Sequence, residues 1–385
     1  MKIRTGNPAR GSDFFNRKNL IQKAWDLIES GSHILIAAPR RVGKTSLMYF
    51  LLDHPKENYT FLYLITESVN NENEFFRRVV NKVLKTDFVQ TAQKVLAFLQ
   101  ENKPIIKKVG PSGVEFGVNE EHNYREMLGK ILASPSEGKK LIIMLDEFPE
   151  TLENIIEDEG AGAGKHFLQS NRELRQEAEI SDQVQFIYTG SIGLENVVSQ
   201  LNAVNTINDL ARLKIPPLTN NQAGNMINLL LENVDFDLSD HLIEYILEKI
   251  EWLIPFYIQL VIQELKYLYR DEATADISEE TVDQAFRGML EQRQHFEHWH
   301  TRLRASFKGK DYSFVKNLLN IAAETGFISS NEIYDLAVKY EKEDSFKTFV
   351  GALIYDGYIN NHDDPGKYRY NSPILRMWWR QNVAN

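Results

Sequence analysis

The chain has 385 residues, enough for two or three domains at about 150 residues each, and its formal net charge of −10 argues against broad nonspecific binding to nucleic acid. Hydrophobic residues at 43% and charged residues at 25% are typical of globular proteins, and the lack of cysteine excludes disulfides, thiolate zinc sites and cysteine nucleophiles. No apolar run approaches the roughly 18 residues of a membrane span, and residues 1–15 lack an apolar signal core, so we expect a cytoplasmic protein with no membrane partner.

Short apolar runs alternate with helical periodicity through the first half of the chain. Such runs are typical of buried strands, and their alternation with helices indicates a parallel sheet covered on both faces. An insertion at about 86–124 interrupts the pattern, and two short runs around Gly110-Pro111-Ser112-Gly113 predict a hairpin within it. The expected helices are 21–28, 46–52 and 74–84, and the expected strands are 33–37, 60–65, 140–145 and 184–188.

The pattern changes after Pro216-Pro217. From 221 to about 290 the periodicity is helical, which predicts a small domain over 216–295, and the basic stretch 296–310 is expected to be a linker helix. The remaining residues, 311–385, predict three helices followed by a hairpin, an order that describes a winged helix. Its helices are expected at 313–323, 331–340 and 345–355, and its hairpin strands at 358–359 and 368–370.

The main chemical signal lies between the first expected strand and the next helix. Ala38-Pro39-Arg40-Arg41-Val42-Gly43-Lys44-Thr45-Ser46 matches a phosphate-binding P-loop, with Ala38 where the usual first glycine stands. Such a loop wraps phosphates with backbone N–H groups at a helix N-terminus. We expect Lys44 to reach the β- and γ-phosphates of ATP, and the Thr45 hydroxyl to bind Mg²⁺. The expected fold class is therefore α/β, a P-loop NTPase sheet flanked by helices over 1–215, followed by the helical lid and the winged helix.

A second glycine-rich stretch resembles a P-loop in composition only. Gly160-Ala161-Gly162-Ala163-Gly164-Lys165 follows acidic residues instead of a strand, and His166 stands where serine or threonine is needed. We interpret this stretch as a flexible loop.

Polar residues follow two of the later expected strands. Asp146 and Glu147 suit a Walker B element, in which Asp146 holds Mg²⁺ directly or through water and Glu147 polarises the attacking water. In Thr189-Gly190-Ser191, a polar side chain beside the Walker B strand can sense the γ-phosphate. An ordinary turn is an equally good interpretation of this last segment on the sequence alone.

Together these residues resemble the AAA+/STAND-type ATPases of archaea and bacteria that carry a C-terminal winged helix. The resemblance covers nearly the whole chain, and its most specific elements are Pro-Arg-Arg-Val-Gly-Lys-Thr-Ser and the final Ser-Pro with paired tryptophans. It implies that the protein binds ATP or ADP with Mg²⁺ and hydrolyses ATP. The matching segments are 14–17, 38–45, 145–149, 189–194, 217–219, 254–257 and 370–379.

The resemblance also implies roles outside the two motifs. Arg17 lies in what resembles an N-terminal element near the base and phosphates, Ser191 resembles the sensor-one position, and Pro255 resembles the proline of the lid's GxP element. The chain departs from the pattern at Asn16 and Leu253, where glycine is usual, and the second departure weakens the expected contact of the lid with nucleotide.

Several arginines and tryptophans have both a functional and a structural interpretation. Arg172 and Arg175 lie where related ATPases can place an arginine that acts in trans, although we prefer the interpretation that they are solvated surface residues. Residues 311–385 contain eight Lys/Arg against ten Asp/Glu, and the expected third helix is mostly apolar, unlike a helix that reads the major groove. Trp378 and Trp379 are therefore expected in the core, and the nucleic-acid contact, if one exists, at 302–310.

Two classes of function follow. The first is an ATP-hydrolysing switch that couples nucleotide state to rearrangement of the lid and winged helix, and the intact Glu147 favours it. The alternative is a nucleotide-binding scaffold or DNA-associated regulator with little turnover. A small-molecule kinase is a weaker option, because the C-terminal modules offer no obvious acceptor site. Beside ATP, we expect a protein partner or self-association, with DNA only weakly supported.

Overall fold

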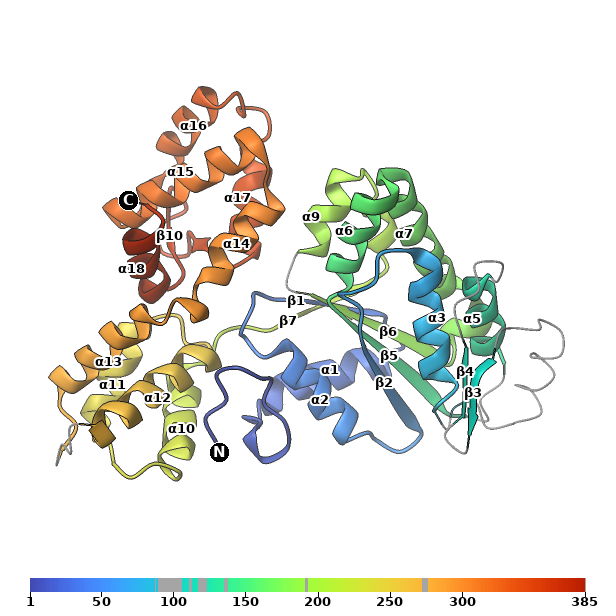
Figure 1. Ribbon diagram of the computed structural model, residues 1–385, viewed down its shortest axis with the longest axis horizontal. Coiled ribbons are helices and arrows are strands. Elements are labelled where there is room, and N and C mark those ends of the chain that lie inside the picture. Colours follow the sequence, from blue (N-terminus) through green and yellow to red (C-terminus); the bar gives the residue numbers. More distant parts are fainter. Residues whose placement is uncertain are drawn as a thin grey trace. The chain divides into compact units, whose positions relative to one another are not determined.

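The computed structural model describes residues 1–86, 88, 106–110, 113–116, 123–134, 138–190, 193–271 and 276–384, with the backbone alone for 106–110, 113–116 and Asp271. These residues divide into two compact units (Figure 1). The sheet unit comprises Asn16–Ala37 and Lys44–Ile215, and the C-terminal unit comprises Met1–Phe15, Ala38–Gly43 and Pro216–Asn385. The expected division at 215, 295 and 310 into four parts stays a prediction.

Five parallel strands form the sheet of the sheet unit. Their order is β2 (Tyr59–Ile65), β5 (Lys140–Asp146), β6 (Val184–Thr189), β1 (Ile34–Ala37) and β7 (Ala211–Lys214). Four of these strands are the expected ones. Strand β7 was not expected from the sequence, because its alternating Ala-Arg-Leu-Lys pattern belongs to a half-exposed edge strand and not to a buried run.

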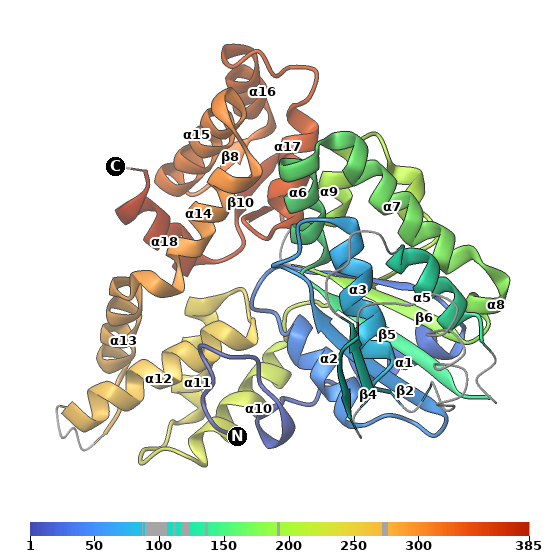
Figure 2. The ribbon, with the colours of Figure 1, turned by 45° about the vertical axis from the view of Figure 1, so that its right-hand side comes forward.

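Helices cover both faces of this sheet, as Figures 1 and 2 show for α1 and α2 on one side and α6, α7 and α9 on the other. On the first side Trp25 meets Phe61 edge to face, and Tyr49 meets Tyr63. The helices are α1 (Lys18–Glu29), α2 (Lys44–Asp53), α3 (Glu72–Val83), α5 (Tyr124–Leu132), α6 (Phe148–Glu159), α7 (Ala161–Gln176), α8 (Ala178–Ser181) and α9 (Leu194–Gln200), with the 3-10 turn η2 (Val204–Ile207).

The expected hairpin is present in the insertion. Strand β3 (Ile106–Gly110) pairs antiparallel with β4 (Gly113–Phe116), with Gly110 opposite Gly113. The remainder of 86–124 lies largely outside the described residues.

The expectation of a flexible loop at 160–166 is wrong, because helix α7 begins at Ala161. Gly160, at φ 92°, separates α6 from α7, and these two helices pack against each other. A Cβ at Gly164 would lie only 2.5 Å from Cγ1 of Ile156, so glycine is what permits this close approach. Tertiary packing therefore outweighs the low helix propensity of the glycines.

The C-terminal unit is mainly helical. Thr219 and Ser278 cap helices through reciprocal side-chain and backbone bonds, as does Ser329 with Glu332. The helices are α10 (Asn220–Leu231), α11 (Asp240–Ile250), α12 (Pro255–Asp271), α13 (Glu279–Glu291), α14 (Glu297–Ser306), α15 (Gly309–Thr325), α16 (Ser330–Lys339), α17 (Phe346–Tyr355) and α18 (Pro373–Asn382), with 3-10 turns η1 (Gly11–Asp13) and η3 (Arg293–His295).

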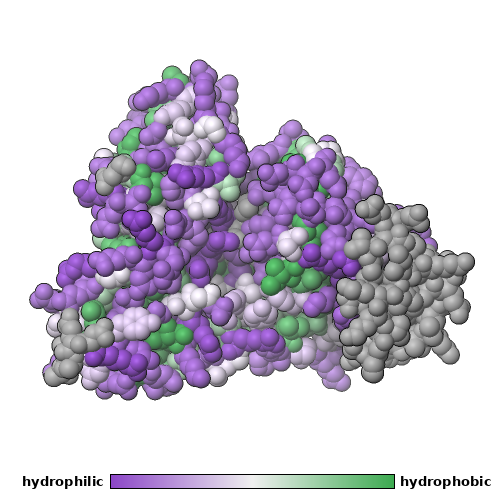
Figure 3. Space-filling model, viewed as in Figure 1, coloured by the Kyte–Doolittle hydropathy of each residue, from purple (hydrophilic) through white to green (hydrophobic). Residues whose placement is uncertain are grey.

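The last part of the chain contains the elements that the winged-helix prediction requires. Strand β8 (Ile328–Ser329) lies between α15 and α16 in the chain, and β9 (Ile359–Asn360) and β10 (Lys367–Tyr370) follow α17. The three strands form an antiparallel sheet with β10 in the middle. Trp378 and Trp379 of α18 are 2% and 0% exposed, so their expected packing in the core is confirmed. The face drawn in Figure 3 is largely hydrophilic, and within the described residues no helix is long and apolar enough to cross a membrane.

Candidate nucleotide site

The P-loop segment has the strand–loop–helix context that its motif requires. Strand β1 ends at Ala37, and helix α2 begins at Lys44, which is only 7% exposed. Gly43 has φ 102°, a left-handed backbone angle that favours glycine, and Ser46 is buried in the first turn of α2. The backbone between strand and helix is therefore shaped as a phosphate loop, with a helix N-terminus directly after it.

Residues 38–43 of this loop pack within the C-terminal unit. The backbone of Arg41 is in the left-handed region at φ 67°, which is unusual for a residue other than glycine. Its Nη1 donates a hydrogen bond to the carbonyl of Thr5 at 3.1 Å. Its guanidinium carbon lies 4.6 Å from the ring centroid of Phe256, the second residue of α12. Burial, followed by the charge of Arg40, lowers the pKa of Arg41. Phe256 lies in the matching segment 254–257, in which a role was expected only for Pro255, so the Arg41–Phe256 contact was not expected from the sequence.

A second contact to the loop comes from the turn after α17. Gly357 has φ 84°, and a Cβ there would lie 2.8 Å from Cβ of Pro39 and 3.1 Å from the ring of Trp252. Any larger residue at Gly357 would therefore collide with the phosphate loop.

Asp146 ends β5 and is joined to the P-loop helix by a hydrogen bond. The hydroxyl of Thr45 donates to Oδ2 of Asp146 at 2.9 Å, and the hydroxyl of Tyr63 donates to the same oxygen at 2.8 Å. The sequence motifs thus correctly predicted that Thr45 and Asp146 lie close together in space, although they are 101 residues apart in the chain. It missed Tyr63, whose position on the expected strand at 60–65 was the available signal.

The electrostatics around Asp146 favour a cation. Burial, and then the charge of Glu147, raise the pKa of Asp146, although the hydrogen bonds from Tyr63 and Thr45 and the charge of Lys44 act in the opposite direction. Burial and the neighbouring Asp146 charge likewise raise the pKa of Tyr63, so its hydroxyl keeps its proton and remains a donor. A bound divalent cation reverses this balance by stabilising the ionised carboxylate.

Glu147 follows Asp146 in a strained backbone conformation. Its φ of 58° and ψ of 36° are left-handed, and α6 begins at the next residue with Pro149 in its first turn. Such a conformation in a residue other than glycine costs about 1–3 kcal/mol and is concentrated at functional sites. The strain accords with the role that the sequence assigned to this carboxylate.

The segment after β6 contains one polar group in an unusual environment. Thr189 is fully buried, and its hydroxyl has no hydrogen-bond partner within the described residues. Strand β6 lies between β5 and β1, and a Cβ at Gly190 would lie 2.4 Å from Cδ of Pro149, so glycine is required there. Ser191, the expected sensor-one residue, lies outside the described residues. Among the described residues of this segment, Thr189 is therefore the candidate for contacting the terminal phosphate of a bound nucleotide.

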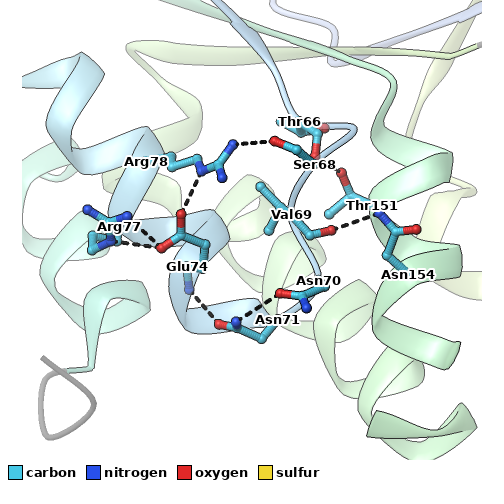
Figure 4. A network of polar contacts seen from close by, with 10 residues as sticks. All are labelled: Thr66, Ser68, Val69, Asn70, Asn71, Glu74, Arg77, Arg78, Thr151 and Asn154. Atoms are coloured by element: carbon cyan, nitrogen blue, oxygen red, sulfur yellow. Dashed lines mark hydrogen bonds and ion pairs between the residues drawn. The ribbon is translucent and has the colours of Figure 1, made fainter. Parts of the chain in front are cut away.

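A polar network links the loop after β2 to the end of β5 and to α6, and Figure 4 draws its members on this loop, on α3 and on α6. The Thr66 hydroxyl donates to the Asp146 carbonyl at 3.0 Å, and the Thr151 hydroxyl of α6 donates to the Thr66 carbonyl at 2.7 Å. The amide of Asn154 donates to the carbonyl of Val69 at 3.1 Å. Figure 4 also shows Glu74 bonded to Arg77 and Arg78, and Arg78 to Ser68.

Arg175 is neither a trans-acting arginine nor a solvated surface residue. It is 4% exposed, its Nε donates to Asp209 Oδ2 at 2.7 Å, and its Nη2 donates to the Thr206 carbonyl at 2.6 Å. Both interpretations of Arg175 are therefore corrected, because these bonds hold it in the interior. Arg172 is partly exposed, and its role stays a prediction. Arg17 is buried before α1, which lowers its pKa, and its nucleotide contact likewise stays a prediction.

Three of the basic side chains of 302–310 contact other residues of the protein. Arg302 is 7% exposed and pairs with Asp356 at 3.0 Å, and Lys310 pairs with Glu341 at 2.6 Å. Arg304 lies over the ring of Tyr312 at 5.8 Å. The expectation that this whole stretch presents cations to nucleic acid is wrong for Arg302, because its charge is balanced in the interior.

The residues of the site fit a Mg²⁺ ion that is held jointly by the protein and the nucleotide phosphates. Within the described residues no group of three or more His, Cys, Asp or Glu side chains could hold a metal ion by itself. Thr45 and Asp146 instead provide two oxygens beside a phosphate loop, and Mg²⁺ is typically held by one or two protein oxygens together with nucleotide phosphates. The donor set therefore fits the expected metal.

No protein-family model and no curated protein matches the chain. Solved structures do resemble it. A Walker-type ATPase of Pyrococcus abyssi has a TM-score of 0.65 and 18% identity, and covers 99% of this chain and 100% of that chain. The ORC2 protein of Aeropyrum pernix, solved in ADPNP–ADP complexes, has a TM-score of 0.53 and 11% identity, and covers 92% of this chain and 88% of that chain. The expected resemblance is confirmed at the level of the fold, which is that of P-loop ATPases.

Proposed function

We propose that this protein is a Mg²⁺-dependent ATPase that works as an AAA+/STAND-like switch. The observation that carries the proposal is the hydrogen bond from Thr45 to Asp146, which joins the phosphate loop to the end of β5. The two similar structures, a Walker-type ATPase and a protein solved in ADPNP–ADP complexes, support the same class of ligand.

Each residue of the site has a role that follows from its chemistry. Backbone N–H groups of 38–46 and the ammonium of Lys44 bind the phosphates. Thr45 and Asp146 would hold Mg²⁺, which supplies charge stabilisation at the β- and γ-phosphate oxygens when bound. Glu147 orients and polarises the attacking water, and Thr189 contacts the γ-phosphate. Ser191, the sequence-based candidate for the same contact, stays a prediction.

The packing of the loop supports the coupling of nucleotide to the C-terminal unit. Pro39 and Arg41 contact Gly357, Phe256 and Thr5, so a change in the loop backbone on phosphate binding alters contacts made by α12 and by the turn after α17. The Arg41–Phe256 contact gives the lid a connection to the loop that does not depend on Pro255. The alternative is a nucleotide-binding scaffold or DNA-associated regulator with little turnover, and the strained Glu147 favours the ATPase.

The test compares Glu147→Gln with Asp146→Asn. Glutamine keeps the shape of Glu147 but cannot accept a proton, so we expect ATP and Mg²⁺ to bind as in the parent while hydrolysis slows about 10²–10⁴-fold. Asp146→Asn weakens the metal and therefore nucleotide affinity as well. Calorimetry and single-turnover hydrolysis distinguish the two carboxylates.

Two outcomes would contradict the proposal. Hydrolysis at the parental rate in Glu147→Gln would remove Glu147 as the catalytic carboxylate. A parent that binds ATP but never hydrolyses it, even with a partner protein present, would leave the scaffold as the better function.

A further inference from the structure

Tyr63 contacts the expected metal-binding carboxylate, although neither motif contains it. It lies on β2, the edge strand next to β5, where Tyr63 pairs in register with Met144. Side chains two residues apart share a face of a strand, so Met144 and Asp146 lie on one face of β5. From the neighbouring strand, the Tyr63 hydroxyl donates to Asp146 Oδ2 at 2.8 Å.

The two hydroxyl donors together occupy one oxygen of Asp146. Thr45 donates to Oδ2 at 2.9 Å and Tyr63 at 2.8 Å, and a carboxylate oxygen has about two lone-pair positions. Oδ1 accepts the backbone N–H of Glu147 at 3.2 Å, which leaves acceptor capacity there. Oδ1 is therefore the oxygen available to a metal ion or a metal-bound water. Because the Thr45 proton points to Asp146, the lone pairs of Thr45 remain for the metal.

The chemistry of tyrosine suits this position. Its ring meets the ring of Tyr49 on α2 at a centroid distance of 5.0 Å and an interplanar angle of 61°, which restricts where the hydroxyl can lie. The hydroxyl holds the carboxylate without adding positive charge, whereas an arginine here would neutralise Asp146 and compete with a cation. Arg175 does this to Asp209 elsewhere in the same unit.

We propose that Tyr63 is a positioning residue for the metal of the nucleotide site, fixing the Asp146 carboxylate so that Oδ2 orients Thr45 and Oδ1 faces the metal. This inference rests on the proposed function, because it requires a Mg²⁺–nucleotide complex, but it does not require hydrolysis. Partners that orient a metal ligand typically contribute 10- to 100-fold to metal affinity.

The experiment measures ADP affinity by calorimetry for the full chain, once with saturating Mg²⁺ and once in EDTA. For Tyr63→Phe, which keeps the ring against Tyr49, we expect the Mg²⁺-dependent gain in ADP affinity to fall by about 10- to 100-fold. ADP affinity in EDTA should match that of the parent. Tyr59→Phe is the matched control, because Tyr59 lies on the same strand and its ring packs on Trp25 at a centroid distance of 5.4 Å.

The outcomes separate this inference from the proposed function. An equal loss of affinity with and without Mg²⁺ would show that Tyr63 only maintains packing, and an undiminished Mg²⁺-dependent gain would show that its hydroxyl does not position the metal. Either result overturns the inference while the parent still binds ADP. A parent without measurable ADP affinity would overturn the proposed function and this inference together. Thermal unfolding of each variant confirms that the fold is retained.

Discussion

Two carboxylates of the sheet unit, the buried Asp146 and the partly buried Asp209, have opposite environments. Asp146 accepts hydrogen bonds from two neutral hydroxyls, and burial followed by the charge of Glu147 raises its pKa. Burial also acts on Asp209, but the hydrogen bonds and charge of Arg175 outweigh it, so the pKa of Asp209 is lowered. A carboxylate that an arginine already balances is part of the scaffold, whereas one that burial leaves destabilised provides a place for a cation.

The same distinction applies to the basic residues. The sequence marked Arg175 and Arg302 as candidates for function, and the structure pairs both with carboxylates in the interior, Arg175 with Asp209 and Arg302 with Asp356. Basic residues in a sequence therefore indicate a binding surface only when the fold leaves them without such partners.

The largest expected effect is the loss of tight nucleotide binding in Lys44→Ala. The variant removes the ammonium that the P-loop brings to the phosphates, so calorimetry should detect little ATP affinity. Lys165→Ala is the matched control, because Lys165 lies in the other glycine-rich stretch, which is part of α7. ATP affinity unchanged in Lys44→Ala, or lost equally in Lys165→Ala, would mean that 38–46 is not the nucleotide site.

The second prediction tests the two carboxylates directly by chemical unfolding at pH 7 without nucleotide. The lowered pKa of Asp209 means that its charge stabilises the fold above its ordinary pKa, and this stability is lost as pH falls through the lowered value. Asp209→Asn should therefore lower the free energy of unfolding by about 3 kcal/mol, since it leaves Arg175 uncompensated.

Asp146→Asn should change stability in the other direction. A raised pKa means that the ionised Asp146 destabilises the folded protein once pH exceeds that pKa, so the neutral amide should raise the free energy of unfolding at pH 7. Equal decreases in the free energy of unfolding for Asp146→Asn and Asp209→Asn would contradict the inferred difference between the two sites.

The third prediction concerns the buried hydroxyl of Thr189. Valine has nearly the same shape and removes a polar group without a partner in the described residues, a group that costs about 1–3 kcal/mol when left unsatisfied. Thr189→Val should therefore leave the protein as stable as the parent or more so, by up to about 1 kcal/mol. If the hydroxyl contacts the γ-phosphate, single-turnover hydrolysis should slow on the order of 10²-fold. Unchanged hydrolysis would make Thr189 an ordinary core residue.

The smallest expected effect is on nucleic-acid binding. Arg302 is buried and paired, and the exposed Lys310 pairs with Glu341 at the surface, so binding should be weak. Arg304 and Lys308 are the other exposed cations of 302–310. Each phosphate contact contributes about −0.9 to the slope of log affinity against log salt, so Lys308→Ala should flatten that slope by about one. A mobility-shift titration over several salt concentrations measures it. Tight, sequence-selective binding that persists at high salt would contradict this expectation.

Local sequence patterns determined much of the fold and the centre of the site. Four of the five sheet strands were expected within one or two residues, because buried parallel strands are continuous apolar runs that need no knowledge of their neighbours. The P-loop and the Asp146-Glu147 pair were identifiable for the same reason, since each is a contiguous motif at the end of such a run.

Tertiary structure decided the remaining features, because each depends on residues distant in sequence. Tyr63 and Asp146 are 83 residues apart, and Arg175 reaches Asp209 across 34. Gly164 belongs to a helix and not to a loop because Ile156 of α6 packs against it. Side-chain type alone does not reveal whether a tyrosine holds a carboxylate or an arginine is already neutralised. The partners that decide this meet only when the strands and helices assemble, and the free energy of those contacts outweighs local propensity.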